Sequence, residues 1–198
     1  KKGCHKGFLS GYGEEQFDRL EQLVRYPEIW APYYTLHKIL AGLLDCYEFA
    51  GCDEALTIAG DLGDWVYERL SKVPHAQLNR MWSLYIAGEF GGMNDAMARL
   101  YIHTAKPEHL EAAKLFNNDR LFYPMAKNVD ALDGLHANQH SPQMVGCMKI
   151  FEAGGETYYR DIARFFWEAV TGAHIYTIGG TGEGEMFHEA GTVAGLLT

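Results

Sequence analysis

Four clusters of histidine, asparagine, glutamate and aromatic residues stand out in the sequence, and each precedes or begins a stretch with helical periodicity. They span residues 30–37, 89–94, 135–140 and 179–188. Aromatic rings can cover sugar faces, and Asn, Gln and His can bind hydroxyl groups, so these clusters predict a carbohydrate site. The side chains expected to contact the sugar are Tyr34, His37, Asn94 and His136.

Glu185 is the candidate for proton transfer. It lies in a glycine-rich segment between Gly184 and the apolar pair Met186 and Phe187. A carboxyl group beside apolar side chains keeps its proton more readily, as a general acid near neutral pH must. The alternative is a solvated loop glutamate, a role that Glu183 would fill equally well.

The other polar residues also have structural interpretations. The His37 ring could bond a backbone carbonyl at a helix start, and Gly91-Gly92 could be a simple turn. Functionally, backbone without Cβ would let Asn94 approach a ligand closely. His136 and His140 are four residues apart and could face the same way, but a metal site would need a third ligand.

Three helical hairpins are predicted from apolar periodicity. They pair residues 37–49 with 54–70, 94–104 with 108–116, and 142–153 with 157–171, with a repeat of about 50 residues. Gly51 suits a helix C-cap, Asp53 an N-cap, and Pro107 a first helical turn. The long polar linkers favour an all-α fold, part of an (α/α)6 toroid whose entry loops line a cup, over an open solenoid.

Charge, hydropathy and cysteine spacing exclude several classes of binding partner. The net charge of −9 argues against nucleic acid, because no basic stripe could neutralise phosphates. The sequence contains no apolar run of about 18 residues, so no membrane-spanning helix is predicted. The four cysteines lack the close spacing of a zinc site: Cys4, Cys46, Cys52 and Cys147.

Three hairpins cannot close a six-hairpin ring, so the expectation is a partial domain over residues 1–198, incomplete at both ends. The sequence does not predict an oligomeric state.

Taken together, these motifs resemble the β-L-arabinofuranosidase glycoside hydrolases, family 127 and its close relatives. The resemblance rests on residues 30–38, 89–94, 135–138 and 184–187, with support from residues 8–12 and 16–20, and runs through nearly the whole chain. It implies an (α/α)6 barrel and a retaining hydrolase of terminal L-arabinofuranose. Glu185 would be the acid/base, with His37 and His136 at the sugar.

The resemblance also implies a zinc-bound cysteine nucleophile in the full-length enzyme. Its Glu-x-Cys motif and later Cys pair would follow Glu185, and no cysteine of this chain stands at a matching position. We therefore expect no metal ligand within these 198 residues and no hydrolysis by this chain alone. The alternatives are a non-catalytic helical-repeat module that binds carbohydrate or protein, and another class of (α/α) barrel sugar enzyme.

Overall fold

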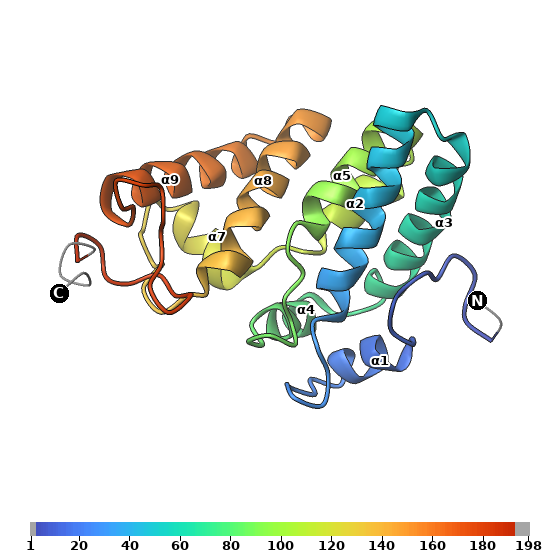
Figure 1. The fold of residues 1–198 in the computed structure, drawn as a ribbon, viewed down its shortest axis with the longest axis horizontal. Helices are drawn as coiled ribbons and strands as arrows, with labels where there is room; N and C mark the ends of the chain where they lie inside the picture. The colour runs from blue at the N-terminus through green and yellow to red at the C-terminus, as the bar shows by residue number, and fades with distance from the viewer. Residues whose placement is uncertain (1–2, 193–198) are drawn as a thin grey trace.

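The computed structural model describes residues 3–192, and helices make up well over half of them (Figure 1). The helices are α1 (Glu15–Glu21), α2 (Pro32–Ala50), α3 (Asp53–Leu70), α4 (His75–Trp82), α5 (Met93–Thr104), α6 (Pro107–Lys114), α7 (Asp119–Met125), α8 (Ala137–Gly154) and α9 (Thr157–Ala173). Within the described range the only β-type pairing is two isolated bridges, His136 with Met186 and Glu183 with Met186. The prediction of an all-α chain is confirmed.

The three predicted hairpins are α2–α3, α5–α6 and α8–α9. Gly51 and Gly155 end α2 and α8 in the left-handed conformation, which glycine adopts without a Cβ penalty. Pro107 starts α6, where its missing N–H costs nothing. The N-cap assignment of Asp53 is wrong: Cys52 occupies the cap without a side-chain hydrogen bond, and Asp53 is the first helical residue.

Two helices begin earlier than periodicity predicted. Helix α2 starts at Pro32 rather than at residue 37, and α8 starts at Ala137 rather than at 142. Pro142 lies inside α8, where it removes one backbone donor but does not end the helix. As a result, His37 lies in the second turn of α2 and His136 is the N-cap residue of α8.

The first helices of the hairpins, α2, α5 and α8, lie side by side, with α5 in the centre (Figure 1). Their N-termini point to the same end of the molecule, because each hairpin returns the chain to its starting end. Helices α3 and α6 pack against each other and against this row. The segments that enter α2, α5 and α8 therefore meet at one end, as a toroid requires.

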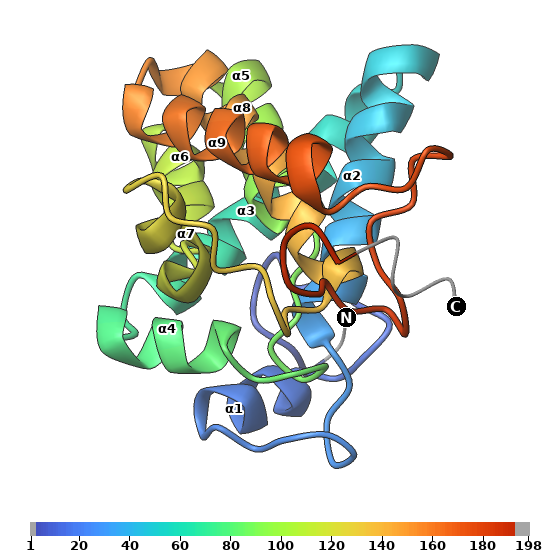
Figure 2. The same cartoon turned by 90° about the vertical axis from the view of Figure 1, so that its left-hand side faces the viewer.

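Three short helices were not predicted: α1 precedes the first hairpin, and α4 and α7 lie in the linkers between hairpins. Helices α1 and α4 pack against each other below the hairpins, and α7 packs against α9 (Figures 1 and 2). Buried aromatic rings form the core beneath the entry segments, with edge-on and stacked contacts among Phe17, Tyr33, Trp82, Phe90 and Phe116. These rings give the entry segments a rigid base.

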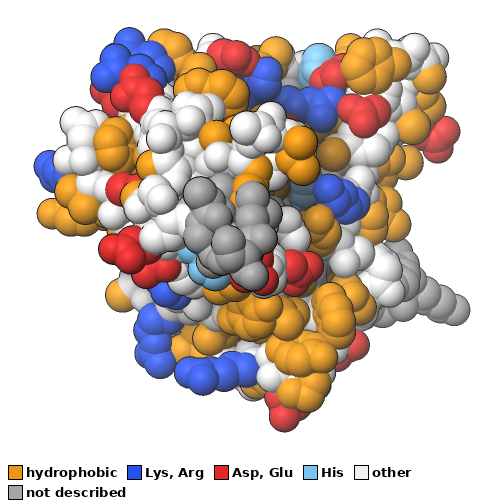
Figure 3. Space-filling view, turned by 60° about the vertical axis from the view of Figure 1, so that its left-hand side comes forward, with side chains coloured by type: hydrophobic (Ala, Val, Ile, Leu, Met, Phe, Trp, Pro, Cys, Tyr) orange, Lys and Arg blue, Asp and Glu red, His pale blue; other side chains and the backbone are white. Residues whose placement is uncertain are grey.

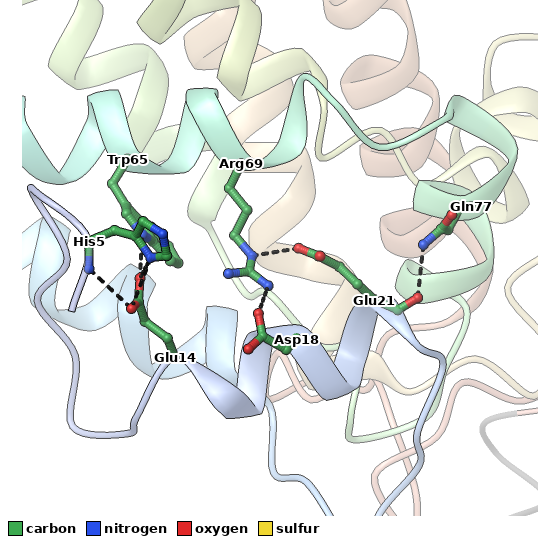
Figure 4. A network of polar contacts seen from close by, with 7 residues as sticks. All are labelled: His5, Glu14, Asp18, Glu21, Trp65, Arg69 and Gln77. Atoms are coloured by element: carbon green, nitrogen blue, oxygen red, sulfur yellow. Dashed lines mark hydrogen bonds and ion pairs between the residues drawn. The ribbon is translucent and has the colours of Figure 1, made fainter. Parts of the chain in front are cut away.

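A polar network attaches α1 to α3 (Figure 4). The Arg69 guanidinium of α3 donates to Asp18 and Glu21 of α1, and only 14% of its side chain is exposed. Beside it, the Trp65 indole N–H donates to Glu14 at 2.9 Å. Because Arg69 also packs over the Phe17 ring, the network joins charge pairing to the aromatic core.

An apolar hollow of about 750 Å³ lies over α8 and α9, lined in part by Met144, Phe166 and the largely exposed Trp167. Among the described helices, none combines the length and the apolar character needed to cross a membrane.

Candidate active site

Glu185 and His136 come together because their two backbone segments pair. The Ala137 N–H donates to the Glu185 carbonyl at 2.9 Å, and the Phe187 N–H donates to the Leu135 carbonyl at 2.8 Å. The Gly134 N–H completes the pairing by donating to the Phe187 carbonyl. Residues 183–187 are therefore fastened to the entry of α8, although α8 and α9 separate the two segments in the sequence.

His136 lies at the entry of α8, and only 10% of its side chain is exposed. Its Nδ1 lies 3.0 Å from Glu89 Oε1, and its Nε2 lies 3.7 Å from Glu185 Oε2. Nε2 itself is buried and has no hydrogen-bond partner among the described residues. The histidine thus lies between two carboxylates that come from different linkers.

The Glu185 side chain is 67% exposed, which corrects the expected apolar environment. Phe187 points into the core against Phe166 and His174, so it does not cover the carboxylate. Glu185 has a φ of +67°, a conformation that few non-glycine residues adopt. Such strain concentrates at functional sites, where the surrounding structure enforces it. In this chain the backbone hydrogen bonds to residues 134–137 hold Glu185 in this conformation.

Tyr34 and His37 lie on the first two turns of α2 and face the Gly91-Gly92 turn. The Gly92 N–H donates to His37 Nδ1 at 3.3 Å, so Nε2 carries the hydrogen of the neutral ring. Burial, assisted by the charges of Lys38 and Arg99, lowers the pKa of His37 to about 4. His37 is therefore neutral at pH 7 and offers an Nε2–H donor, and the expected bond to a backbone carbonyl is absent from the described contacts.

The missing Cβ atoms of Gly91 and Gly92 make room for the His37 ring and do not bring Asn94 closer to a ligand. A Cβ on Gly91 would come 2.9 Å from both His37 Nδ1 and Tyr34 Cδ2, and Gly91 has a φ of +56°. Asn94 is fully buried between α5 and α8, where its Nδ2 donates to the Gln143 carbonyl at 2.9 Å. The prediction that Asn94 contacts substrate is therefore corrected, because its amide is committed to packing between helices.

Exposed aromatic rings border the same end. Trp30, Tyr34 and Tyr85 are each more than a third exposed, and Tyr85 packs edge-on against His136 with the ring centres 5.6 Å apart. Figure 3 shows hydrophobic and acidic side chains next to one another on one face of the molecule. Rings beside carboxylates are the surface that a sugar needs, with apolar faces to cover and hydroxyls to bind.

Glu89 and Tyr85 are the residues that motif reasoning missed. Glu89 stands in the same linker as the Gly91-Gly92 turn, and the Ile86 N–H donates to its Oε1 at 3.2 Å. The available signal was a carboxylate in the cluster 89–94, which occupies the same part of the repeat as the cluster that carries His136. Tyr85 had no signal in sequence spacing, because it follows the short helix α4, which was itself not predicted.

The comparison with known families decides the classification. The family model described as the beta-L-arabinofuranosidase GH127 catalytic domain matches residues 2–198. The chain belongs to this family. GH127 catalytic domains are (α/α)6 barrels, which agrees with the helical hairpins, and the GH127 match makes this a glycoside hydrolase chain with a carbohydrate substrate. Among curated proteins, none matches the sequence significantly.

The zinc implied by the GH127 resemblance does not fit the described residues. No group of three or more His, Cys, Asp or Glu side chains within residues 3–192 is arranged to hold a metal ion. His140 does not pair with His136 through a ligand, since its Nδ1 bonds the His136 carbonyl at 2.7 Å. Cys147 is fully buried in α8, and burial raises the pKa of its thiol, which disfavours a thiolate. No reaction step is therefore assigned to zinc or to these groups.

Proposed function

We propose that this GH127 chain carries the sugar-binding and proton-transfer residues of a retaining β-L-arabinofuranosidase. The observation that carries the proposal is the position of Glu185, whose exposed carboxylate lies 3.7 Å from the buried Nε2 of His136. A retaining hydrolase needs one carboxyl group that protonates the leaving oxygen and then, as carboxylate, activates water. Glu185 would fill both roles.

The sugar would lie against the exposed rings beside this carboxylate. Tyr34 presents a partly exposed ring, and His37 would donate from Nε2–H to a sugar hydroxyl because its Nδ1 is already bonded to Gly92. His136 would orient Glu185 beside the sugar.

The test of Glu185 uses leaving groups of different acidity in the full-length protein. Without its general acid, the Glu185→Ala variant should lose about 10²–10⁴-fold in rate on methyl β-L-arabinofuranoside. It should lose much less on the 2,4-dinitrophenyl glycoside, whose leaving group needs no proton. Glu183→Ala is the matched control, because Glu183 lies in the same loop and is also more than half exposed.

Equal losses on both substrates would contradict an acid/base role for Glu185. Binding of L-arabinofuranosides with no hydrolysis of either substrate would favour a carbohydrate-binding module instead. Saturation-transfer NMR on the purified chain measures that binding directly, and Tyr34→Ala should weaken it.

A further inference from the structure

Glu89 determines which nitrogen of the neutral His136 ring carries the hydrogen. Only 12% of the Glu89 side chain is exposed, and its Oε1 accepts the Ile86 N–H at 3.2 Å. The same oxygen lies 3.0 Å from His136 Nδ1. A carboxylate accepts hydrogen bonds, so the hydrogen of the neutral ring belongs on Nδ1. Nε2 is then left with a free lone pair.

The free nitrogen points to the proposed acid/base. Nε2 is buried without a described hydrogen-bond partner, and Glu185 Oε2 lies 3.7 Å away. This distance is longer than a hydrogen bond, but the Glu185 side chain is largely exposed and can turn inward without leaving a packed position. A protonated Glu185 would satisfy Nε2, since its O–H donates and the lone pair accepts.

The other groups around His136 add little competing charge. Tyr85 covers one side of the ring edge-on, and His140 bonds the backbone carbonyl of His136. Burial lowers the pKa of His140 to about 4, so this ring is neutral at pH 7. Arg120 lines the small cavity of about 160 Å³ next to both histidines and is the one cation of that cavity's lining. Within the described residues, the two carboxylates are therefore the groups that set the state of His136.

We propose that Glu89 is a positioning residue that fixes His136 as the Nδ1–H tautomer, so that Nε2 shares a proton with Glu185. In the acid state the Glu185 O–H donates to Nε2. Transfer breaks that O–H bond and forms an Nε2–H bond, which leaves an imidazolium between two carboxylates, and the reverse step returns the proton. The naming of Glu185 as acid/base rests on the proposed function, whereas the tautomer of His136 does not.

Nitrogen-15 NMR of the purified chain reads the tautomer without any substrate. For the neutral ring of wild-type His136, Nδ1 should give the shift of a protonated nitrogen and Nε2 that of a nitrogen without a hydrogen. Glu89→Ala removes the acceptor, and the two shifts should exchange, as the Nε2–H form takes over. Glu89→Gln keeps an acceptor oxygen of the same shape and should retain the wild-type pattern.

Contact with Glu185 is tested in the same spectra. The Nε2 shift of His136 should differ from the wild-type value in Glu185→Gln and match it in the control Glu183→Gln. An Nε2–H tautomer in the wild type, or an unchanged tautomer in a folded Glu89→Ala variant, would overturn the proposal. Circular dichroism establishes that each variant is folded.

Kinetics of the full-length protein separates this proposal from the proposed function. Glu89→Ala should lower the rate on the methyl glycoside by about tenfold to a hundredfold, the effect of losing one hydrogen bond to a charged group. Glu89→Gln should recover part of that loss and alter the pH profile. If Glu185→Ala is active while the tautomer is as expected, the proposed function fails alone. If Glu185 is essential but the tautomer is reversed, the role of Glu89 fails alone.

Discussion

Replacing Gly146 by alanine should destabilise the fold strongly, because this glycine is where α5 and α8 approach most closely. An added Cβ would clash with the side-chain amide of Asn94, because the two would lie far closer than van der Waals contact allows. Asn94 is fully buried and cannot move away without breaking its bond to the Gln143 carbonyl. The two helices would have to separate or the hydrogen bond would have to break.

The expected magnitude follows from three terms. Overpacking a filled core costs about 1–3 kcal/mol, and stranding the buried amide costs about 1–3 kcal/mol more. The better helix propensity of alanine returns about 1 kcal/mol. The unfolding free energy of Gly146→Ala should therefore fall by about 1–5 kcal/mol, which lowers the Tm by at least about 2 °C at this chain length.

Gly42→Ala is the matched control, since Gly42 also lies inside a helix, α2, and nothing lies within 4 Å of its added Cβ. It should stabilise the chain by up to about 1 kcal/mol. Urea denaturation followed by circular dichroism measures both. If Gly146→Ala is as stable as Gly42→Ala, the contact with Asn94 does not limit the approach of the helices. In the double variant with Asn94→Ala, part of the loss should be recovered.

Three further outcomes are expected. Gly91→Ala should weaken binding of L-arabinofuranosides measured by NMR, because its Cβ would press on the His37 ring; Gly155→Ala has the same left-handed strain with open space and should leave binding unchanged. Burial keeps His140 neutral in the fold, so stability should fall by up to about 3 kcal/mol as the pH drops from 6.5 to about 4. Urea titrations should give a shallower fall for His140→Gln, and an identical slope would contradict this. Arg69→Ala should cost about 1–3 kcal/mol in thermal unfolding, since it releases α1 from α3, against almost nothing for the exposed Arg164→Ala.

The hairpins could be predicted because their signals are local. Apolar positions recur at helical spacing in each long helix, and Gly51 and Pro107 mark boundaries through their own backbone constraints. The short helices α1, α4 and α7 span about two turns each, and unlike the equally short α6, none of them is the second half of a predicted hairpin. Their stability comes from packing against the hairpins, which spacing along the chain does not encode.

The site was predicted only in part. His136 and Glu185 were selected by residue type and repeat phase, and the structure brings them together, although their roles remain proposals. Asn94 was misplaced because its phase on α5 depends on where the helix begins, and a start at Met93 turns the second residue toward α8. Glu89 was missed because its contact with His136 spans two linkers and depends on how both fold.

The pairing of residues 134–137 with 183–187 also ties this site to the α8–α9 hairpin. Its two halves are far apart in the chain, and they meet because α8 and α9 turn the backbone around. The loop-closure entropy is paid by the helices, and the carboxylate and the imidazole are then gained together in one cooperative step. Hydrogen exchange at the Ala137 and Phe187 amides should accordingly slow in unison with the α8–α9 hairpin. A substitution that weakens the packing of α9 against α8 should therefore separate Glu185 from His136, although it changes neither residue.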